Sequence, residues 1–159
     1  MWRLAATLLC LSMAGLLAGC AAEPTPEERI RGHIASAEQA AEARDTGDVM
    51  AFVAADYRDE RGHTPEDLRN YLRGLFLRYQ SVHLLVRVEA IRVQETEASS
   101  TLFVAMAGQP ITEANAFMLR ADVHRLDLAW QLRDGEWQVT GAAWRRAARE
   151  DLLGAAAAH

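Results

Sequence analysis

Three polar residues that could do chemistry lie close together in the sequence: Asp56, Tyr57 and Asp59. A carboxylate beside a phenol can serve in acid–base catalysis when an apolar pocket shifts its pKa and a donor lies near the developing charge. The more ordinary interpretation is a polar loop at the end of a helix, with Tyr57 packed beneath it. We favour that second interpretation.

Histidines form the next group of candidates. His83 and His124 lie in segments of alternating apolar residues, which predict strands, so either ring can point into a pocket. Asp122 and Asp127 flank His124, and an aspartate–histidine pair suits proton transfer near neutral pH. A solvent-facing or structurally paired histidine is the commoner arrangement. His63 comes just before a predicted helix and is interpreted as a loop residue.

Tryptophans near the C-terminal end of the chain form the third group. Trp130, Trp137 and Trp144 could form the floor of an apolar ligand pocket. Packing in the core and across strands is the alternative, and we expect it for at least two of them. No catalytic residue is assigned. The candidate pocket residues from all three groups are Asp56, Tyr57, His83, His124 and Trp130.

Several kinds of chemistry are excluded by composition. The chain has no lysine, which rules out Schiff-base catalysis and a phosphate-loop lysine. Its two cysteines are Cys10 and Cys20, both near the N-terminus. No Gly-x-Ser-x-Gly elbow occurs, and without further cysteines or a close histidine pair we expect neither a metal nor a cofactor. The net charge of −5 and the lack of a basic stripe argue against nucleic acid as a partner.

Three helices are predicted to position these residues. Thr25-Pro26-Glu27-Glu28 and Thr64-Pro65-Glu66-Asp67 each place a capping threonine before a proline and an acidic residue, which is typical of a helix start. We expect the first helix to end near 45–47. Asp48 is predicted to cap a short second helix, and the third runs toward Tyr79.

Strands follow the helices. Apolar residues alternate after Ser81, with changes of phase near 89–90 and 124–125 that predict β-bulges. The second strand is predicted over 98–107 and the third from about 116. Asp134-Gly135 is a strong signal for a tight hairpin into the last strand. Long, bulged strands curl around one face, so the sequence predicts an α+β fold in which N-terminal helices pack on a curved antiparallel sheet to form a cone.

A resemblance to a known superfamily rests on the final hairpin. The segment 126–139, with Ala143-Trp144 beyond it, carries an Arg-Asp-Gly-Glu-Trp turn between two aromatic strands. This arrangement resembles the nuclear-transport-factor-2-like superfamily, which includes SnoaL-like and ketosteroid-isomerase-like proteins, and the likeness extends over about 25–146. A cystatin-like fold is the alternative. Within the superfamily the chain is most similar to proteobacterial lipoproteins.

The resemblance implies a ligand pocket inside the cone and, as in many members, a homodimer formed through the sheet. Ketosteroid-isomerase-like proteins use an aspartate and a tyrosine in the cone for proton transfer. No spacing in this chain matches that catalytic pattern, so no catalytic residue is carried over.

The N-terminal segment predicts where the protein resides. An arginine, a short apolar run and small residues lead to Leu17-Ala18-Gly19-Cys20, which resembles the lipobox of bacterial lipoproteins. The resemblance implies lipidation at Cys20, and Ala21 after it implies the outer membrane, with the domain facing the periplasm and inner-membrane anchoring left open. The predicted division is a cleaved signal (1–19), a lipidated tether (20–24), the folded domain (25–146) and an Ala/Arg-rich tail (147–159).

Together these patterns predict a lipid-anchored cell-envelope protein. We expect a non-enzymatic module that binds a small apolar ligand or an envelope protein partner. The alternative is a small SnoaL-like isomerase or hydrolase that uses an Asp/His or Asp/Tyr pair in the cone.

Overall fold

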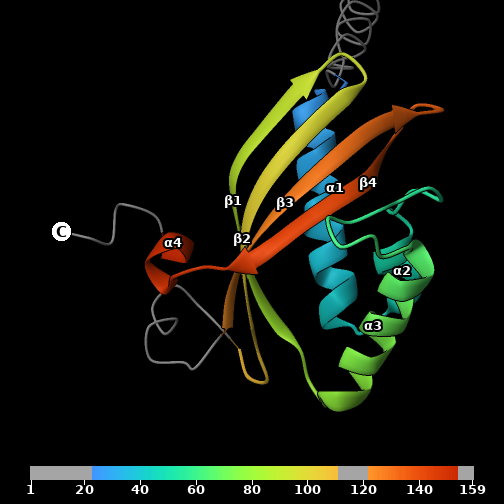
Figure 1. Ribbon diagram of the computed structural model, residues 1–159. Helices are drawn as coiled ribbons and strands as arrows, with labels where there is room; N and C mark the ends of the chain where they lie inside the picture. Colours follow the sequence, from blue (N-terminus) through green and yellow to red (C-terminus); the bar gives the residue numbers. More distant parts are fainter. Residues whose placement is uncertain (1–22, 111–121, 154–159) are drawn as a thin grey trace, which may run out of the picture.

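The computed structural model describes residues 23–110 and 122–153. Helices precede a four-stranded antiparallel sheet in the order β1-β2-β3-β4, so the predicted α+β class is confirmed (Figure 1). The elements are α1 (Pro26–Glu42), α2 (Thr46–Met50), α3 (Pro65–Arg78), β1 (His83–Gln94), β2 (Glu97–Ala107), β3 (Asp122–Arg133), β4 (Glu136–Arg146) and α4 (Arg149–Leu153).

The helix starts follow the predicted local chemistry. Thr25 and Glu28 form a reciprocal capping box at α1, and Thr64 and Asp67 form another at α3. The predicted cap of α2 is wrong by one turn. Asp45, not Asp48, is the N-cap, and its Oδ1 accepts the backbone N–H of Asp48 at 3.0 Å. Arg44 has a φ of 58° and turns the chain sharply after α1. The next residue, Asp45, therefore has the extended backbone that an N-cap requires.

One of the two predicted β-bulges is confirmed, and the other lies at a different position in the sheet. The pairing of β1 with β2 shifts between Val88 and Ala90, as the phase change predicted. No shift occurs at 124–125. It falls instead between Ala129 and Trp130, where Thr140 is the extra residue on β4. The change of phase in β3 has a different cause: both faces of this strand are covered, so Val123 packs on one side and Leu126 on the other.

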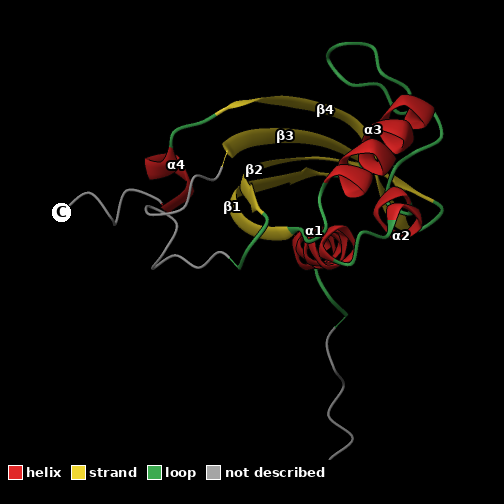
Figure 2. Ribbon diagram, turned by 90° about the horizontal axis from the view of Figure 1, so that it is seen from below, coloured by secondary structure: helices red, strands yellow, loops and turns green. Residues whose placement is uncertain are grey.

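The main core lies between α1 and the concave face of the sheet. Ile30 and Trp137 are fully buried there, and Trp130 and Leu102 pack beside them. Helix α1 packs directly against β1, whereas α3 makes its principal helix contact with α2. Figure 2 shows α1, α2 and α3 on the concave side of the curved sheet. One end of the concave face is therefore covered by the packed helix α1, and the other end lies under α3.

The convex face carries its own helix. Leu152 of α4 is buried against Phe103, Ala105 and Val123, and α4 lies on the side of the sheet away from α3 (Figure 2). The C-terminal segment predicted as a tail from 147 therefore contributes to the packing through α4. The rest of this face holds a polar network in which Arg125 and Arg145 bind the carboxylate of Asp127.

No helix in 23–110 or 122–153 is long and apolar enough to cross a membrane.

Candidate functional site: a cavity beneath the third helix

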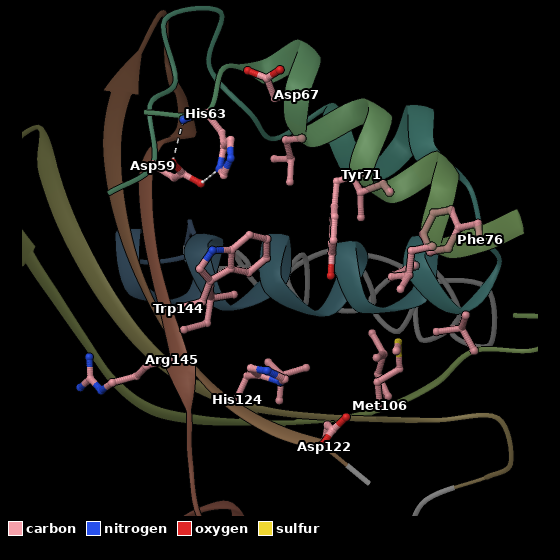
Figure 3. A pocket seen from close by; sticks show the side chains of 18 of the residues that line it. Asp59, His63, Asp67, Tyr71, Phe76, Met106, Asp122, His124, Trp144 and Arg145 are labelled. Carbon is pink, nitrogen blue, oxygen red and sulfur yellow. Dashed lines mark hydrogen bonds and ion pairs between the residues drawn. The ribbon is translucent and has the colours of Figure 1, made fainter. Parts of the chain in front are cut away.

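An open cavity of about 610 Å³ lies between α3 and the concave face of the sheet (Figure 3). Its walls are mainly apolar. Helix α3 contributes Leu68, Leu72 and Leu75, and the strands contribute Val104 and Leu126. A cavity of this size and character is typical of a small-molecule site.

An aromatic pair stands at one side of this cavity. Trp144 of β4 and Tyr71 of α3 meet edge to face, with ring centroids 5.7 Å apart and an angle of 62° between the rings. Both side chains line the cavity, and Tyr71 is among the exposed large hydrophobic side chains of the described residues. Such aromatic pairs contribute about 0.5–1.5 kcal/mol beyond the area that they bury. The pair connects α3 to the sheet across the cavity without filling it.

A second group of lining residues is polar. His124 and Arg146 lie opposite each other in the pairing of β3 with β4, and both line the cavity. Asp122 lies two residues before His124 and, because side chains alternate along a strand, faces the same side. His124 and Asp122 are exposed. The polar end of the cavity is therefore open to solvent.

The loop between α2 and α3 closes the cavity's remaining side. Its first part follows β4 as an added edge: Arg58 N–H donates to the Thr140 carbonyl at 3.1 Å, and Glu60 N–H donates to that of Ala142 at 3.0 Å. Gly141 suits this crossing, because a Cβ there would lie 3.1 Å from the Arg58 carbonyl oxygen, a tight contact. The loop is thus fixed to the sheet before it reaches His63.

Asp59 and His63 form the most strongly bonded polar pair in the cavity lining. The Nδ1 atom of His63 lies 2.6 Å from Oδ2 of Asp59, and Oδ1 accepts the backbone N–H groups of Arg61 at 2.9 Å and His63 at 2.8 Å. The Asp59 side chain is 2% exposed and that of His63 is 50% exposed. Burial alone raises the pKa of a carboxyl, but the hydrogen bonds from His63 and Arg61 outweigh it and hold the pKa of Asp59 below its usual range.

The five residues predicted from the sequence are not brought together. His124 lines the cavity. Asp56 lies on the surface, where both of its carboxylate oxygens accept from Arg133, at 2.6 and 2.9 Å. Tyr57 is buried in the main core, and burial followed by the charge of Asp59 raises its pKa to about 12.

The other two predicted residues have structural positions. His83 alternates with Leu84, a cavity residue, and therefore lies on the other side of β1. Trp130 is a core residue whose Nε1 donates to the Ser100 hydroxyl at 2.9 Å. Trp137 is also buried, so two of the three tryptophans are core residues as expected, and Trp144 is the one that reaches the cavity. Cys20 lies outside the described residues.

Sequence reasoning missed the Asp59–His63 pair. It treated His63 as a simple loop residue and grouped Asp59 with Asp56. The available signal was the four-residue spacing across Gly62, whose φ of 83° reverses the chain between the two residues. Within the part of the chain that the structure describes, no cluster of three or more His, Cys, Asp or Glu could hold a metal ion.

Comparisons with known proteins identify the fold. No protein-family model and no curated protein sequence matches the chain. Among solved structures, Bd1075 of Bdellovibrio bacteriovorus superposes with a TM-score of 0.60 at 11% identity over 75% of this chain, which spans only 40% of that protein. A scytalone-dehydratase-like protein of Novosphingobium aromaticivorans gives a TM-score of 0.63 at 14% identity, with coverage of 77% of this chain and 84% of the other.

A nuclear-transport-factor-2-like protein from Pseudomonas putida is similar over 72% of this chain and 82% of its own length, with a TM-score of 0.55 and 16% identity. At these identities the likeness concerns the fold alone. The chain therefore has the nuclear-transport-factor-2-like fold, as its final hairpin predicted. Because this fold serves many functions, the role of the chain has to be argued from its own cavity.

Proposed function

We propose that this chain binds a small, largely apolar ligand in the cavity beneath α3. The observation that supports the proposal is the cavity itself, about 610 Å³ of open space in contact with leucine, valine and aromatic side chains. Apolar surface exposed to water costs about 25 cal/mol per Å², so a ligand that covers these walls gains affinity from burial alone. Polar groups at the open end would fix its orientation.

A fluorescent apolar probe, 1-anilinonaphthalene-8-sulfonate, tests the proposal in solution. The full chain should bind the probe with enhanced emission, and Val104→Trp should weaken that binding because the larger ring takes up part of the cavity. The matched control is Ala129→Trp, which adds the same ring to an exposed position that alternates with Trp130 on the other side of β3. If Val104→Trp binds the probe as well as the unchanged chain does, the cavity is not the site.

Identification of the natural ligand requires native material. Mass spectrometry of small molecules that co-purify in larger amount with the unchanged chain than with Val104→Trp should reveal the ligand's chemical class. An apolar compound found in equal amount in both preparations would not be bound in the cavity.

We further propose that the domain acts at a membrane, to which lipid at Cys20 attaches it. Support comes from Leu17-Ala18-Gly19-Cys20 and the apolar run before it. Two or more acyl chains hold a protein stably at a bilayer, since each buried methylene contributes about 0.8 kcal/mol. The domain would then take its ligand from the envelope, on the periplasmic side of the outer membrane.

Cys20→Ser tests the anchor separately from the cavity. The variant should appear in the soluble fraction of lysed bacterial cells while the unchanged chain sediments with membranes. Continued membrane association of Cys20→Ser would contradict lipid anchoring and leave the cavity proposal intact.

A further inference from the structure

Exposed apolar side chains gather on the C-terminal half of α3. Within the described residues, the exposed large hydrophobic side chains are those of Tyr71, Leu77 and Tyr79, which are 55%, 89% and 36% exposed. Single exposed apolar residues are normal on a protein surface, but here all three lie within one short segment, 71–79. Apolar residues gathered in this way indicate an interaction surface.

Positive charge accompanies this apolar group. The acidic residues of α3, Glu66 and Asp67, both lie in its first turn, and from 68 to 79 every charged residue is an arginine. Arg69 is bound to Glu66. Arg73 and Arg78 form neither an ion pair nor a side-chain hydrogen bond with any residue in 23–110 or 122–153. Because the chain has a net charge of −5, this local excess of positive charge is opposite in sign to the whole.

The helix places these charges around the exposed leucine. Arg73 is four residues before Leu77, so the two side chains are neighbours on the helix surface, and Arg78 follows Leu77 directly. Tyr71 and Arg78, seven residues apart, lie in line along one flank of the same face. Helix α3 runs along the outside of the molecule (Figure 1), and its opposite face carries the leucines that line the cavity, Leu68, Leu72 and Leu75.

A leucine flanked by arginines and bordered by tyrosines has the composition of a surface that rests on a lipid bilayer. Leucine enters the acyl region, arginine extends its charged end to the phosphates, and tyrosine suits the level of the headgroups. A partner protein would need carboxylates and an apolar pocket at matching positions. A bilayer of anionic lipid offers negative phosphates and apolar chains everywhere on its surface, so it is the occupant that this arrangement favours.

We propose that the α3 patch, formed by Tyr71, Arg73, Leu77, Arg78 and Tyr79, docks on a bilayer that contains anionic phospholipid. Leu77 inserts among the acyl chains, and Arg73 and Arg78 bind the lipid phosphates. The inference goes beyond the proposed function, because the contact requires neither the lipid anchor nor a ligand in the cavity.

The α3 patch and the cavity share one residue. Tyr71 belongs to the patch and also lines the cavity, where its ring meets that of Trp144. A bilayer that covers the patch would therefore lie beside the cavity. An apolar ligand would then pass between the bilayer and the cavity with little exposure to water.

A fluorophore on the patch tests the contact. The full chain carries Cys10→Ser and Cys20→Ser, and Leu77→Cys is labelled with bimane, an apolar dye that takes the place of the exposed leucine. The comparison chain carries the same label at Ser99→Cys, an exposed position on β2. Both are mixed with vesicles of equal parts phosphatidylglycerol and phosphatidylcholine that include a doxyl-labelled lipid as quencher. The N-terminal segment is identical in the two chains, so a difference between them reports contact at the label itself.

The two labels should respond differently. Emission from the Leu77→Cys label should shift to shorter wavelength and be quenched by the doxyl lipid, whereas emission from the Ser99→Cys label should remain unchanged. Vesicles of phosphatidylcholine alone should give a weaker response, and added salt should weaken the response to the anionic vesicles, because it screens the arginines. No response at Leu77→Cys, or an equal response from both labels, would overturn the proposal.

Two pairs of arginine variants test the charge. Arg73→Gln combined with Arg78→Gln should weaken the contact about 30-fold, from the usual contribution of two basic side chains at an anionic surface. The control, Arg31→Gln with Arg92→Gln, removes the same charge from exposed positions elsewhere and should weaken it far less. Urea unfolding accompanies both pairs, because a cation in the last turn of a helix also offsets its dipole. Equal effects of the two pairs would refute phosphate binding by the patch.

A protein partner would give a different result. If the Leu77→Cys label ignores vesicles but shifts as the concentration of the chain itself is raised, the patch contacts a second copy and the bilayer proposal is wrong. Probe binding in the cavity and sedimentation of the unchanged chain are measured separately. Failure of the α3 patch therefore leaves the proposed function intact.

Discussion

The two ends of the concave face are built from the same strands but differ in how they are covered. At the packed end, Leu102 of β2, Trp130 of β3 and Trp137 of β4 are buried under α1. At the open end, Val104 and Trp144, only a few residues farther along β2 and β4, line a cavity. The strands alternate apolar and polar residues at both ends, so the sequence pattern does not distinguish them.

The difference lies in the helix above each end. Helix α1 presents Ile30 and Ile34 to the sheet and packs against β1. Helix α3 instead makes its main contact with α2, and its apolar side faces the cavity. The core under α1 is close-packed, as protein interiors usually are, whereas the space under α3 is open to solvent and leaves apolar walls uncovered.

Replacing a tryptophan at each end of the concave face should give the largest difference in the free energy of unfolding. Trp137→Ala should lower the free energy of unfolding by about 3–5 kcal/mol, because it leaves a cavity in the core. Trp144→Ala should cost much less stability, since its ring already borders open space, and should weaken probe binding. Urea unfolding and probe titration measure the two effects.

Trp137→Phe serves as the control at the packed end. The buried Nε1 of Trp137 has no partner among the described residues, so phenylalanine keeps an aromatic ring and removes an unsatisfied donor. Its cost should be clearly below that of alanine. Equal losses for Trp137→Ala and Trp144→Ala would contradict the distinction between the two ends.

Replacing Asp59, at the open end, should lower the free energy of unfolding by a smaller amount that depends on pH. Its pKa in the folded chain lies below the unfolded value of about 3.9, so the ionised form stabilises the fold above that pH, and this contribution is lost as the pH falls through the folded pKa. Asp59→Asn should cost about 1–3 kcal/mol at pH 7, because buried hydrogen bonds to a charge are disturbed. The difference from the unchanged chain should shrink in acid.

Urea unfolding at about pH 7 and again at about pH 3 measures this difference. Asp56→Asn is the matched control: its carboxylate is on the surface with Arg133, so the change should affect stability less than Asp59→Asn does. A cost for Asp59→Asn that is independent of pH would show that the charge of Asp59 does not stabilise the loop.

The two helix caps should give the smallest effects. Thr25→Ala and Thr64→Ala each remove one capping box and should each cost about 1 kcal/mol. Hydrogen exchange distinguishes their consequences. Thr64→Ala should accelerate exchange in α3, whose main contact is with α2, whereas Thr25→Ala should leave α3 unchanged. Equal protection of α1 and α3 in the unchanged chain would argue against a loosely held α3.

Much of the fold could be predicted because its signals are local. The two capping boxes, the bulge near Glu89 and the Asp134-Gly135 turn each depend on residues a few positions apart. At that turn both residues have positive φ, 51° and 85°, as a tight hairpin requires. Alternation of apolar residues predicted the strands and, with them, the curved sheet. The second bulge was misplaced because alternation cannot show that β3 is covered on both faces.

The site could not be predicted in the same way. His83 and His124 looked equivalent in the sequence, and only the register of the sheet shows that His124 faces the cavity while His83 does not. Asp59 and His63 were visible as residues but not as a pair, because their contact depends on a loop held along β4 and reversed at Gly62.

By itself, the sequence determined the starts of α1 and α3, the strand order along the chain and the final hairpin, while the lipid anchor at Cys20 stays a prediction. These are consequences of backbone preferences and alternation over short distances. Only the tertiary structure decided where the concave face is filled and where it stays open. That outcome depends on how far each helix lies from the sheet, which is fixed by packing between residues distant in the chain.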